Sequence, residues 1–185
     1  MRIVSISENN NLEKRIAITP DIAKKYIALG CEVSLSENYG EHLGFTDNEY
    51  KELGVTISKT EKEIINSADV IVQLGLPSDD KISLIRENQT LIGVLNPYEN
   101  KKKIESLVKN KINTFSLELL PRITRAQSMD ILSSQANLAG YKAVVESFAN
   151  FEKAIPMMMT AAGTIPAAKV LVVGAGVAGL QAIAT

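Results

Sequence analysis

The chain is poor in several residue types, and each shortage excludes some classes of function or site. A single cysteine, Cys31, among 185 residues excludes an internal disulfide and is compatible with a reducing compartment. Cys31 opens a segment of alternating apolar residues, so we expect a half-buried thiol. The single histidine, His42, lies in a glycine-flanked loop, which favours an exposed residue over a catalytic base. No cluster of Cys, His and acidic residues has metal-ligand spacing, so we predict no metal site.

Neither sign of charge dominates, and no long apolar run is present. The 20 basic and 21 acidic residues give a net charge of −1, which offers no electrostatic case for binding nucleic acid or an anionic membrane. The N-terminus lacks the basic and apolar regions of a signal peptide. The longest uncharged stretch, residues 170–185, is too short and too rich in glycine for a membrane span. A hydrophobic content of 45% indicates a soluble globular protein.

Short apolar runs alternate with charged, amphipathic runs over residues 1 to about 118. The pattern predicts strands at residues 2–7, 31–37, 55–57, 69–75, 89–95 and 112–120, and helices at 20–30, 46–54, 59–68, 78–88 and 98–111. Pro20 and Gly30 mark the start and end of the first helix, and Thr46 with Glu49 forms a capping box. Alternation of this kind indicates right-handed βαβ crossovers and a parallel sheet.

The character of the sequence changes after Pro121. The pattern predicts a long helix over residues 129–153, a loop over 155–168, a buried strand "KVLVV" at 169–173, and a helix after it. We predict an α/β protein with a parallel-sheet, Rossmann-like N-terminal domain at residues 1–125. A linking helix and loop follow at 126–168, and the first βα unit of a dinucleotide-binding Rossmann domain at 169–185.

Three glycines, Gly174, Gly176 and Gly179, form the pattern G-x-G-x-x-G directly after the apolar run "KVLVV". In a Rossmann domain the first glycine permits a tight turn, the second lets a pyrophosphate approach the start of the helix, and the third permits close packing. The alternative is a packing turn without a ligand. The acidic residue that binds the ribose, about 20 residues further on, falls past the last residue, so we expect the front part of a longer protein.

The stretch "PRITRAQSMDILSSQANLAGYKAV", residues 121–144, carries more kinds of polar side chain than a plain connector needs. Together with "PMMMTAAGTIPAAKVLVVGAGVAGLQAIAT" it resembles the NAD(H)-binding components of proton-translocating NAD(P) transhydrogenases. "EKRIAITP", which contains Arg15, resembles a signature that these proteins share with alanine dehydrogenases. The resemblance covers the whole chain and is most specific from Glu118 onward.

The resemblance implies an Arg–Gln–Asp loop, formed here by Arg122, Gln127 and Asp130, that folds over the nicotinamide end of NAD(H). By this resemblance Gln127 bonds the nicotinamide ribose and reaches toward NADP(H) on a partner component, while Arg122 and Asp130 fix the loop and the carboxamide region. Ser133 reaches the neighbouring ribose or phosphate. The cofactor-binding set is completed by Gly174, Gly176, Val177 and Gly179. We interpret Arg125, Ser134 and Asn137 as solvated positions.

Alanine dehydrogenases share the fold but need an acid/base group and a cationic clamp. Where that group of enzymes has a lysine and a histidine, this chain has Gly75 and Asn96, neither of which transfers protons at neutral pH. Hydride transfer between two nicotinamide rings needs only positioning. The alternatives to a transhydrogenase are an alanine-dehydrogenase-like oxidoreductase and a non-catalytic fragment that keeps dimerisation or partner docking.

The resemblance also implies partners and a location. The expected partners are a membrane-spanning proton-channel component, the NADP(H)-binding component and a second copy in a homodimer, with no nucleic acid. The expected location is cytoplasmic, peripheral to the bacterial inner membrane through those partners. We expect this chain alone to be inactive, with residues 1 to about 120 folded and residues 154–185 mobile, misplaced or packed against another copy, because a lone strand leaves unpaired edges.

Overall fold

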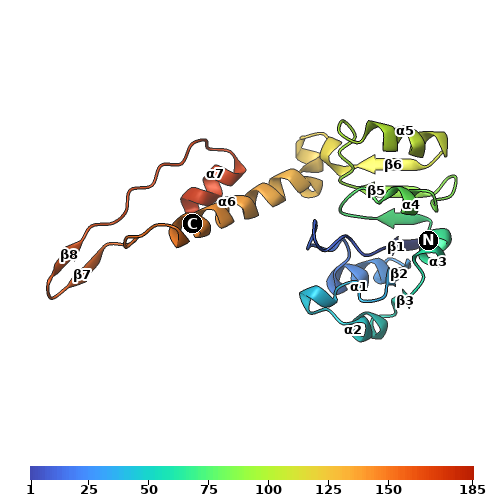
Figure 1. Cartoon of the computed structure of the whole chain (residues 1–185), viewed down its shortest axis with the longest axis horizontal. Coiled ribbons are helices and arrows are strands. Elements are labelled where there is room, and N and C mark those ends of the chain that lie inside the picture. The colour runs from blue at the N-terminus through green and yellow to red at the C-terminus, as the bar shows by residue number, and fades with distance from the viewer. The chain divides into compact units, whose positions relative to one another are not determined.

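The computed structural model describes every residue from Met1 to Thr185. It divides into two compact units, Met1–Leu120 (unit 1) and Pro121–Thr185 (unit 2), which are described separately. Figure 1 labels the elements of both units.

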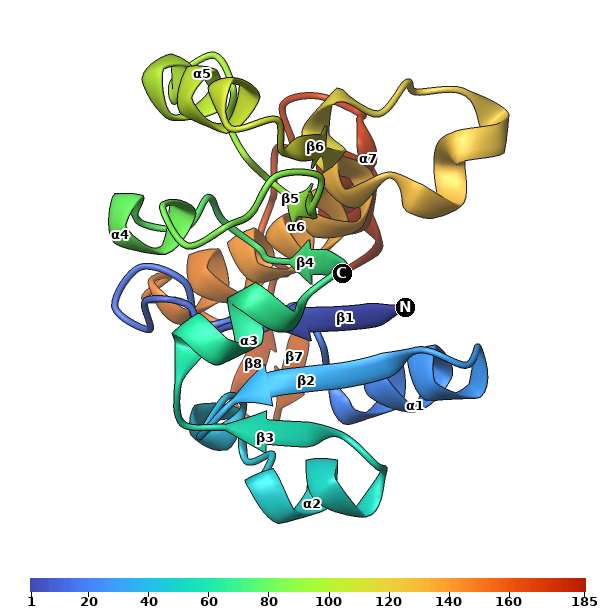
Figure 2. The same ribbon diagram turned by 90° about the vertical axis from the view of Figure 1, so that its right-hand side faces the viewer.

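Unit 1 is built on one six-stranded sheet in which every neighbouring pair is parallel. Its strands are β1 (Arg2–Ser5), β2 (Glu32–Ser36), β3 (Thr56–Ser58), β4 (Val70–Val72), β5 (Thr90–Gly93) and β6 (Asn113–Ser116). The order across the sheet, β3-β2-β1-β4-β5-β6, is that of a Rossmann domain, and Figure 2 shows the strands in this sequence. The predicted α/β class and the parallel N-terminal sheet are therefore confirmed.

Five α-helices connect these strands, each where the sequence predicts one. They are α1 (Pro20–Ala28), α2 (Asp47–Glu52), α3 (Glu61–Ser67), α4 (Asp79–Ile82) and α5 (Lys101–Lys109). Thr46 caps α2 by accepting a hydrogen bond from the backbone N–H of Glu49. Helix α4 is much shorter than the predicted residues 78–88. The last predicted strand also ends early, since β6 gives way to a 3₁₀ turn at Leu117–Leu119.

The core lies on both faces of this sheet. Ile3 and Val4, neighbours on β1, belong to two different hydrophobic clusters, because successive side chains of a strand point to opposite faces. One cluster takes residues from α3, α4 and the loop before β6, and the other packs Tyr39 and Tyr50 against β2. Cys31 is half-buried and His42 is exposed, as the sequence predicts.

A buried hydrogen-bond network joins the carboxyl ends of β1 and β4, where the strand order reverses. Gln73, only 3% exposed, accepts hydrogen bonds through Oε1 from the hydroxyl of Ser5 (2.7 Å) and the backbone N–H of Ile6 (2.9 Å). Its Nε2 donates to the carbonyl of Ile6 (3.1 Å) and to Oε1 of Glu8 (3.3 Å). Both the acceptor oxygen and the donor nitrogen of the Gln73 side chain thus form hydrogen bonds within unit 1.

Replacing Gln73 by leucine should lower the free energy of unfolding of unit 1 by about 2–4 kcal/mol. Leucine has a similar volume but leaves the buried Ile6 N–H and Ser5 hydroxyl without this acceptor, and each such loss costs about 1–3 kcal/mol. Urea titration followed by the tyrosine fluorescence of the chain, to which the buried Tyr39 and Tyr50 contribute, measures the change. The exposed control Lys24→Leu should stay within about 0.5 kcal/mol of the parent; equal stability of the two variants would contradict the role given to Gln73.

Unit 2 begins with a 3₁₀ segment (Thr124–Met129), followed by the 19-residue helix α6 (Ile131–Ala149). The predicted loop at 155–168 is partly wrong, because β7 (Met158–Thr160) and β8 (Gly163–Ile165) pair there as an antiparallel hairpin. The hairpin turn includes Gly163, whose φ of 134° favours glycine. The chain ends with α7 (Val177–Ala184), which packs against α6.

The predicted strand "KVLVV" is not formed. Residues 169–173 pair with no other strand, and Leu171 and Val173 are 87% and 92% exposed. The physical reason is that a strand needs a neighbour for its backbone groups, and no segment of this chain supplies one. The helical half of the predicted βα unit is present as α7, whereas the strand half is not.

Candidate functional site

Three polar residues of the predicted loop meet at the start of α6. Asp130 caps the helix by accepting a hydrogen bond from the backbone N–H of Ser133 (2.9 Å), and the Ser133 hydroxyl donates to its other oxygen (2.7 Å). The guanidinium of Arg122 donates to the Ser133 hydroxyl (3.2 Å) and lies 3.5 Å from the Asp130 carboxylate. The structure therefore brings Arg122, Asp130 and Ser133 together in one cluster.

The charge on Asp130 is stabilised by this cluster. Hydrogen bonds from Ser133, and then the positive charge of Arg122, hold the pKa of Asp130 below its ordinary value. A carboxylate with a lowered pKa adds stability above the ordinary Asp pKa of about 4, and that stability is lost as the pH falls further. At neutral pH the helix cap and the ion pair are both in place.

The glycine turn combines a left-handed glycine with a close approach between backbone atoms. Gly174 has a φ of 100°, which a side chain would strain. Gly176 is the N-cap of α7, and the space where its Cβ would lie is open. A Cβ at Gly179 would collide with the carbonyl of Gly174, so the third glycine is required for the turn to pack on its own helix.

The loop and the start of α7 line the same cavity, of about 450 Å³. Of the predicted site residues, Gln127, Asp130, Ser133 and Val177 line it. Arg122 reaches its wall through Ser133, and the three glycines lie in and around the turn that leads to Val177. The remaining lining residues belong to the same loop and to the first two turns of α6: Ser128, Met129, Ile131, Ser134 and Asn137.

Asn137 is a member of this cavity that the sequence interpretation missed. It is exposed, as expected, but its Nδ2 donates a hydrogen bond to Oε1 of Gln181 on α7 (2.9 Å). The sequence carries a weak signal for this pairing, namely two amide side chains on two predicted helices that flank a glycine turn. Only the packing of α7 on α6 makes the pair recognisable.

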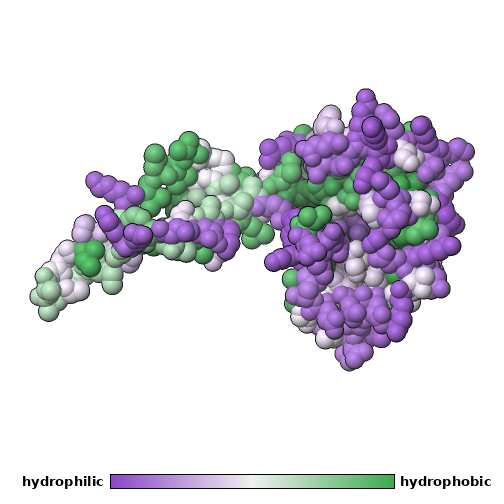
Figure 3. Space-filling view, in the orientation of Figure 1, coloured by the Kyte–Doolittle hydropathy of each residue, from purple (hydrophilic) through white to green (hydrophobic).

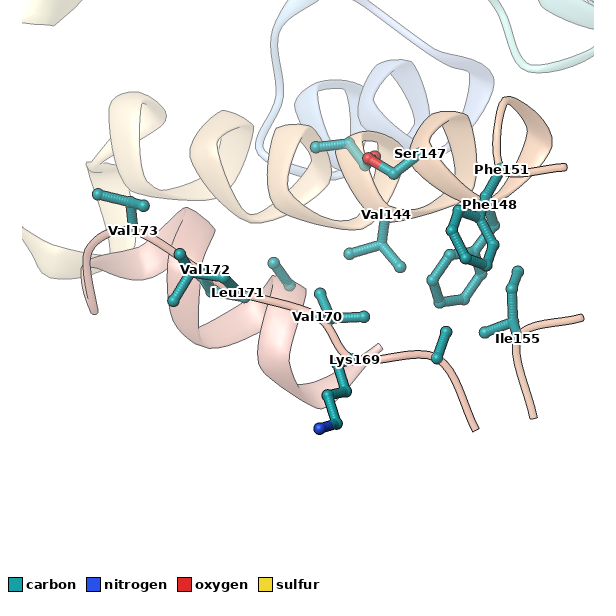
Figure 4. Close-up of a pocket in the computed structure, with 13 residues that line it drawn as sticks. Val144, Ser147, Phe148, Phe151, Ile155, Lys169, Val170, Leu171, Val172 and Val173 are labelled. Atoms are coloured by element: carbon teal, nitrogen blue, oxygen red, sulfur yellow. The ribbon is translucent and has the colours of Figure 1, made fainter. Parts of the chain in front are cut away.

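A second cavity of unit 2, of about 420 Å³, is apolar and unsuited to a charged cofactor. Figure 4 shows Phe148, Phe151 and Ile155 gathered at one end, with residues 170–173 running opposite Val144 of α6. In Figure 3 the part of unit 2 near α7 is mostly hydrophobic, whereas much of the surface of unit 1 in that view is hydrophilic. Lys169 is the only ionisable residue that lines this second cavity.

Unit 1 has a cavity of about 500 Å³ where the strand order reverses. Glu8 lines it and accepts a hydrogen bond from the backbone N–H of Leu74 (2.7 Å); burial raises the pKa of Glu8 despite that bond. Gly75 also lines this cavity and offers no side chain for proton transfer. Asn96 donates its backbone N–H to Glu118. Arg15, beside the cavity, is ion-paired with Glu13.

A doubly wound parallel sheet is typical of α/β proteins that bind dinucleotides, and so is a glycine turn at the start of a helix. Comparison with known proteins gives the family. Residues 5–139 match the alanine dehydrogenase/PNT N-terminal domain, and residues 143–185 match the C-terminal domain. The chain belongs to the alanine dehydrogenase/PNT family.

Two relatives with 46% identity to this chain are transhydrogenases. The chain is 46% identical to the first part of the NAD(P) transhydrogenase alpha subunit of Rhodospirillum rubrum, over 100% of this chain and 50% of that protein. It superposes on the crystal structure of a transhydrogenase from Sinorhizobium meliloti with a TM-score of 0.91 and 46% identity, covering 98% of this chain and 55% of that one.

An L-alanine dehydrogenase structure has the same fold, with a TM-score of 0.83 at 21% identity, covering all of this chain and 51% of that one. The chain thus spans about half the length of the relatives it matches. No helix of the structure combines the length and apolar character required to cross a membrane.

Proposed function

We propose that this chain forms the NAD(H)-binding side of an NAD(P) transhydrogenase that couples hydride transfer from NADH to NADP to proton movement across a membrane. The observation that carries the proposal is the shared cavity, which is lined by Gln127, by the Asp130–Ser133 cap and by Val177, the first residue of α7. The 46% identity to a transhydrogenase subunit across the whole chain supports the same assignment.

The residues present fit NAD(H). The open space at Gly176 admits a pyrophosphate against the N-terminal N–H groups of α7, where an anion is favoured. Gln127 offers both a donor and an acceptor to a ribose, and the Arg122 guanidinium supplies donors to a phosphate or carboxamide oxygen. When bound, NADH would give up a hydride to NADP+, so that NADH is oxidised to NAD+ and NADP+ is reduced to NADPH, with no proton moved in that step.

The part of the protein in such a step is positioning. Asp130, held by Ser133 and Arg122, fixes the loop at the start of a long helix, so that Gln127 presents its amide from a defined place. Proton movement belongs to a membrane-spanning partner, and NADP(H) to a second partner component. We further propose a homodimer on the cytoplasmic side of a bacterial inner membrane, anchored through these partners.

The test uses a completed subunit, in which residues 1–185 are joined to the remaining half of the Rhodospirillum rubrum relative. Mixed with the NADP(H)-binding component, it should oxidise NADH in step with NADP reduction, and its NADH affinity should exceed that of residues 1–185 alone by at least about tenfold. Residues 1–185 hold only the glycine turn and one flanking loop for the cofactor. The absence of NADH binding by the completed subunit would overturn the proposal.

The completed subunit should form no NADH from L-alanine and NAD. Deamination needs a group that takes up a proton at the reacting centre, and Gly75 has no side chain while the amide of Asn96 does not titrate. An absorbance assay at 340 nm with purified protein measures this directly. Alanine-dependent NADH formation above the background without alanine would instead assign the chain to the alanine dehydrogenase branch of the family.

A further inference from the structure

Gly140 lies in the interior of α6, where glycine costs about 1 kcal/mol relative to alanine. It is buried, and a Cβ built on it would lie under 3.0 Å from the carbonyl oxygen, carbonyl carbon and Cα of Ala178 on α7. All three are backbone atoms, so no change of side-chain rotamer could relieve the clash. The glycine is what permits α7 to lie directly on α6.

A hydrogen bond ties the same two helix faces together. Asn137 lies three residues before Gly140 and Gln181 three residues after Ala178, so each pair shares one helix face. The Asn137–Gln181 bond of 2.9 Å therefore fixes α7 against sliding along α6, at the place where Gly140 fixes the distance. Asn137 also lines the cavity of the candidate site.

These contacts determine where the two halves of the site stand relative to each other. The Asp130–Ser133 cap is at the N-terminus of α6, and Val177 of the glycine turn faces the same cavity from α7. We infer that Gly140 is a positioning residue, which with the Asn137–Gln181 bond sets the spacing between the loop and the glycine turn. This inference rests on the proposed role of that cavity in holding NAD(H).

The decisive variant is Gly140→Ala in the completed subunit. A methyl group at residue 140 should push α7 away from α6 by on the order of 1 Å. A misplacement of that size can lower a reaction rate about a hundredfold where the reaction depends on exact positioning. In the proposed site ADP would contact only the turn end, whereas NADH would span both ends. We expect the affinity for NADH to fall at least about tenfold and the affinity for ADP to change less than about threefold. The exposed neighbour Ala139→Ser serves as the matched control and should leave both affinities unchanged.

Two results would overturn the inference. Equal losses for ADP and NADH would mean that Gly140 only stabilises the fold of the turn, and unchanged affinities would mean that the spacing does not depend on it. Hydrogen exchange of the α7 amides provides a readout that does not require the proposed cofactor: Gly140→Ala should accelerate it, whereas helix propensity alone predicts no acceleration. Acceleration in a subunit whose parent binds neither nucleotide would contradict the proposed function and leave the packing role of Gly140 standing.

Asn137→Ala with Gln181→Ala tests the register contact separately. If the bond fixes the register, each single variant should weaken NADH binding by a few-fold, and the double variant should lose no more than the stronger single one, since both remove the same interaction. Fully additive losses would show that the two amides act independently of each other.

Discussion

Shortening Gln127 to asparagine is expected to slow hydride transfer on the order of a hundredfold in the completed subunit assembled with its NADP(H)-binding partner, while NADH affinity changes much less. Asparagine keeps the donor and acceptor of the amide but withdraws them by one methylene, about 1.5 Å, and a misplacement of that size costs about this much when catalysis consists of positioning. The backbone anchor of this residue is retained, because the carbonyl of Gln127 still accepts from the N–H of Asp130.

Single-turnover stopped-flow at saturating NADH measures the effect without interference from product release. Arg125→Lys is the matched control, because Arg125 lies in the same 3₁₀ segment, is exposed and does not line the cavity. Its rate should equal that of the parent. A Gln127→Asn rate equal to the parent would place Gln127 away from the reacting rings, and a loss confined to NADH affinity would make it a binding residue only.

The sequence was sufficient to predict much of unit 1. Its helices carry local signals, such as Pro20 at the start of α1 and Thr46 before α2, and its strands are short apolar runs between them. The order of the strands was beyond such reasoning, because no local signal states that β4 pairs with β1 rather than with β3. The buried Gln73–Glu8 network was missed for this reason, since it exists only where the order reverses.

The candidate site was predictable as residue types and not as contacts. Spacing indicated the three glycines, and resemblance indicated the loop, yet the triangle of Arg122, Asp130 and Ser133 depends on the helix that begins at Ile131. The pairing of Asn137 with Gln181, residues 44 positions apart in the sequence, depends on α7 docking against Gly140. The assignment of a strand at residues 169–173 was wrong because apolar composition favours a buried strand but does not supply its neighbour.

The second large effect is expected in the hydrogen exchange of the unpaired segment at residues 169–173. The backbone amides of residues 170–173 should exchange with solvent at least about a thousandfold faster than those of Val4 and Ile71 in the same sample of residues 1–185. Val4 and Ile71 are at most 1% exposed, on paired central strands of unit 1. Val170 and Leu171 are 64% and 87% exposed, and no strand pairs with their backbone.

Hydrogen–deuterium exchange with mass spectrometry resolves the two regions in one experiment, so the strands of unit 1 serve as the internal control. In the completed subunit the same amides should become protected, because an apolar run of this kind is stable only when strands flank it on both edges. Repeating the measurement over a tenfold range of protein concentration separates a monomer from pairing between copies. Slow exchange of residues 170–173 in a dilute monomer of residues 1–185 would contradict the unpaired state, since it would require a partner strand that the six-stranded sheet and the hairpin do not provide.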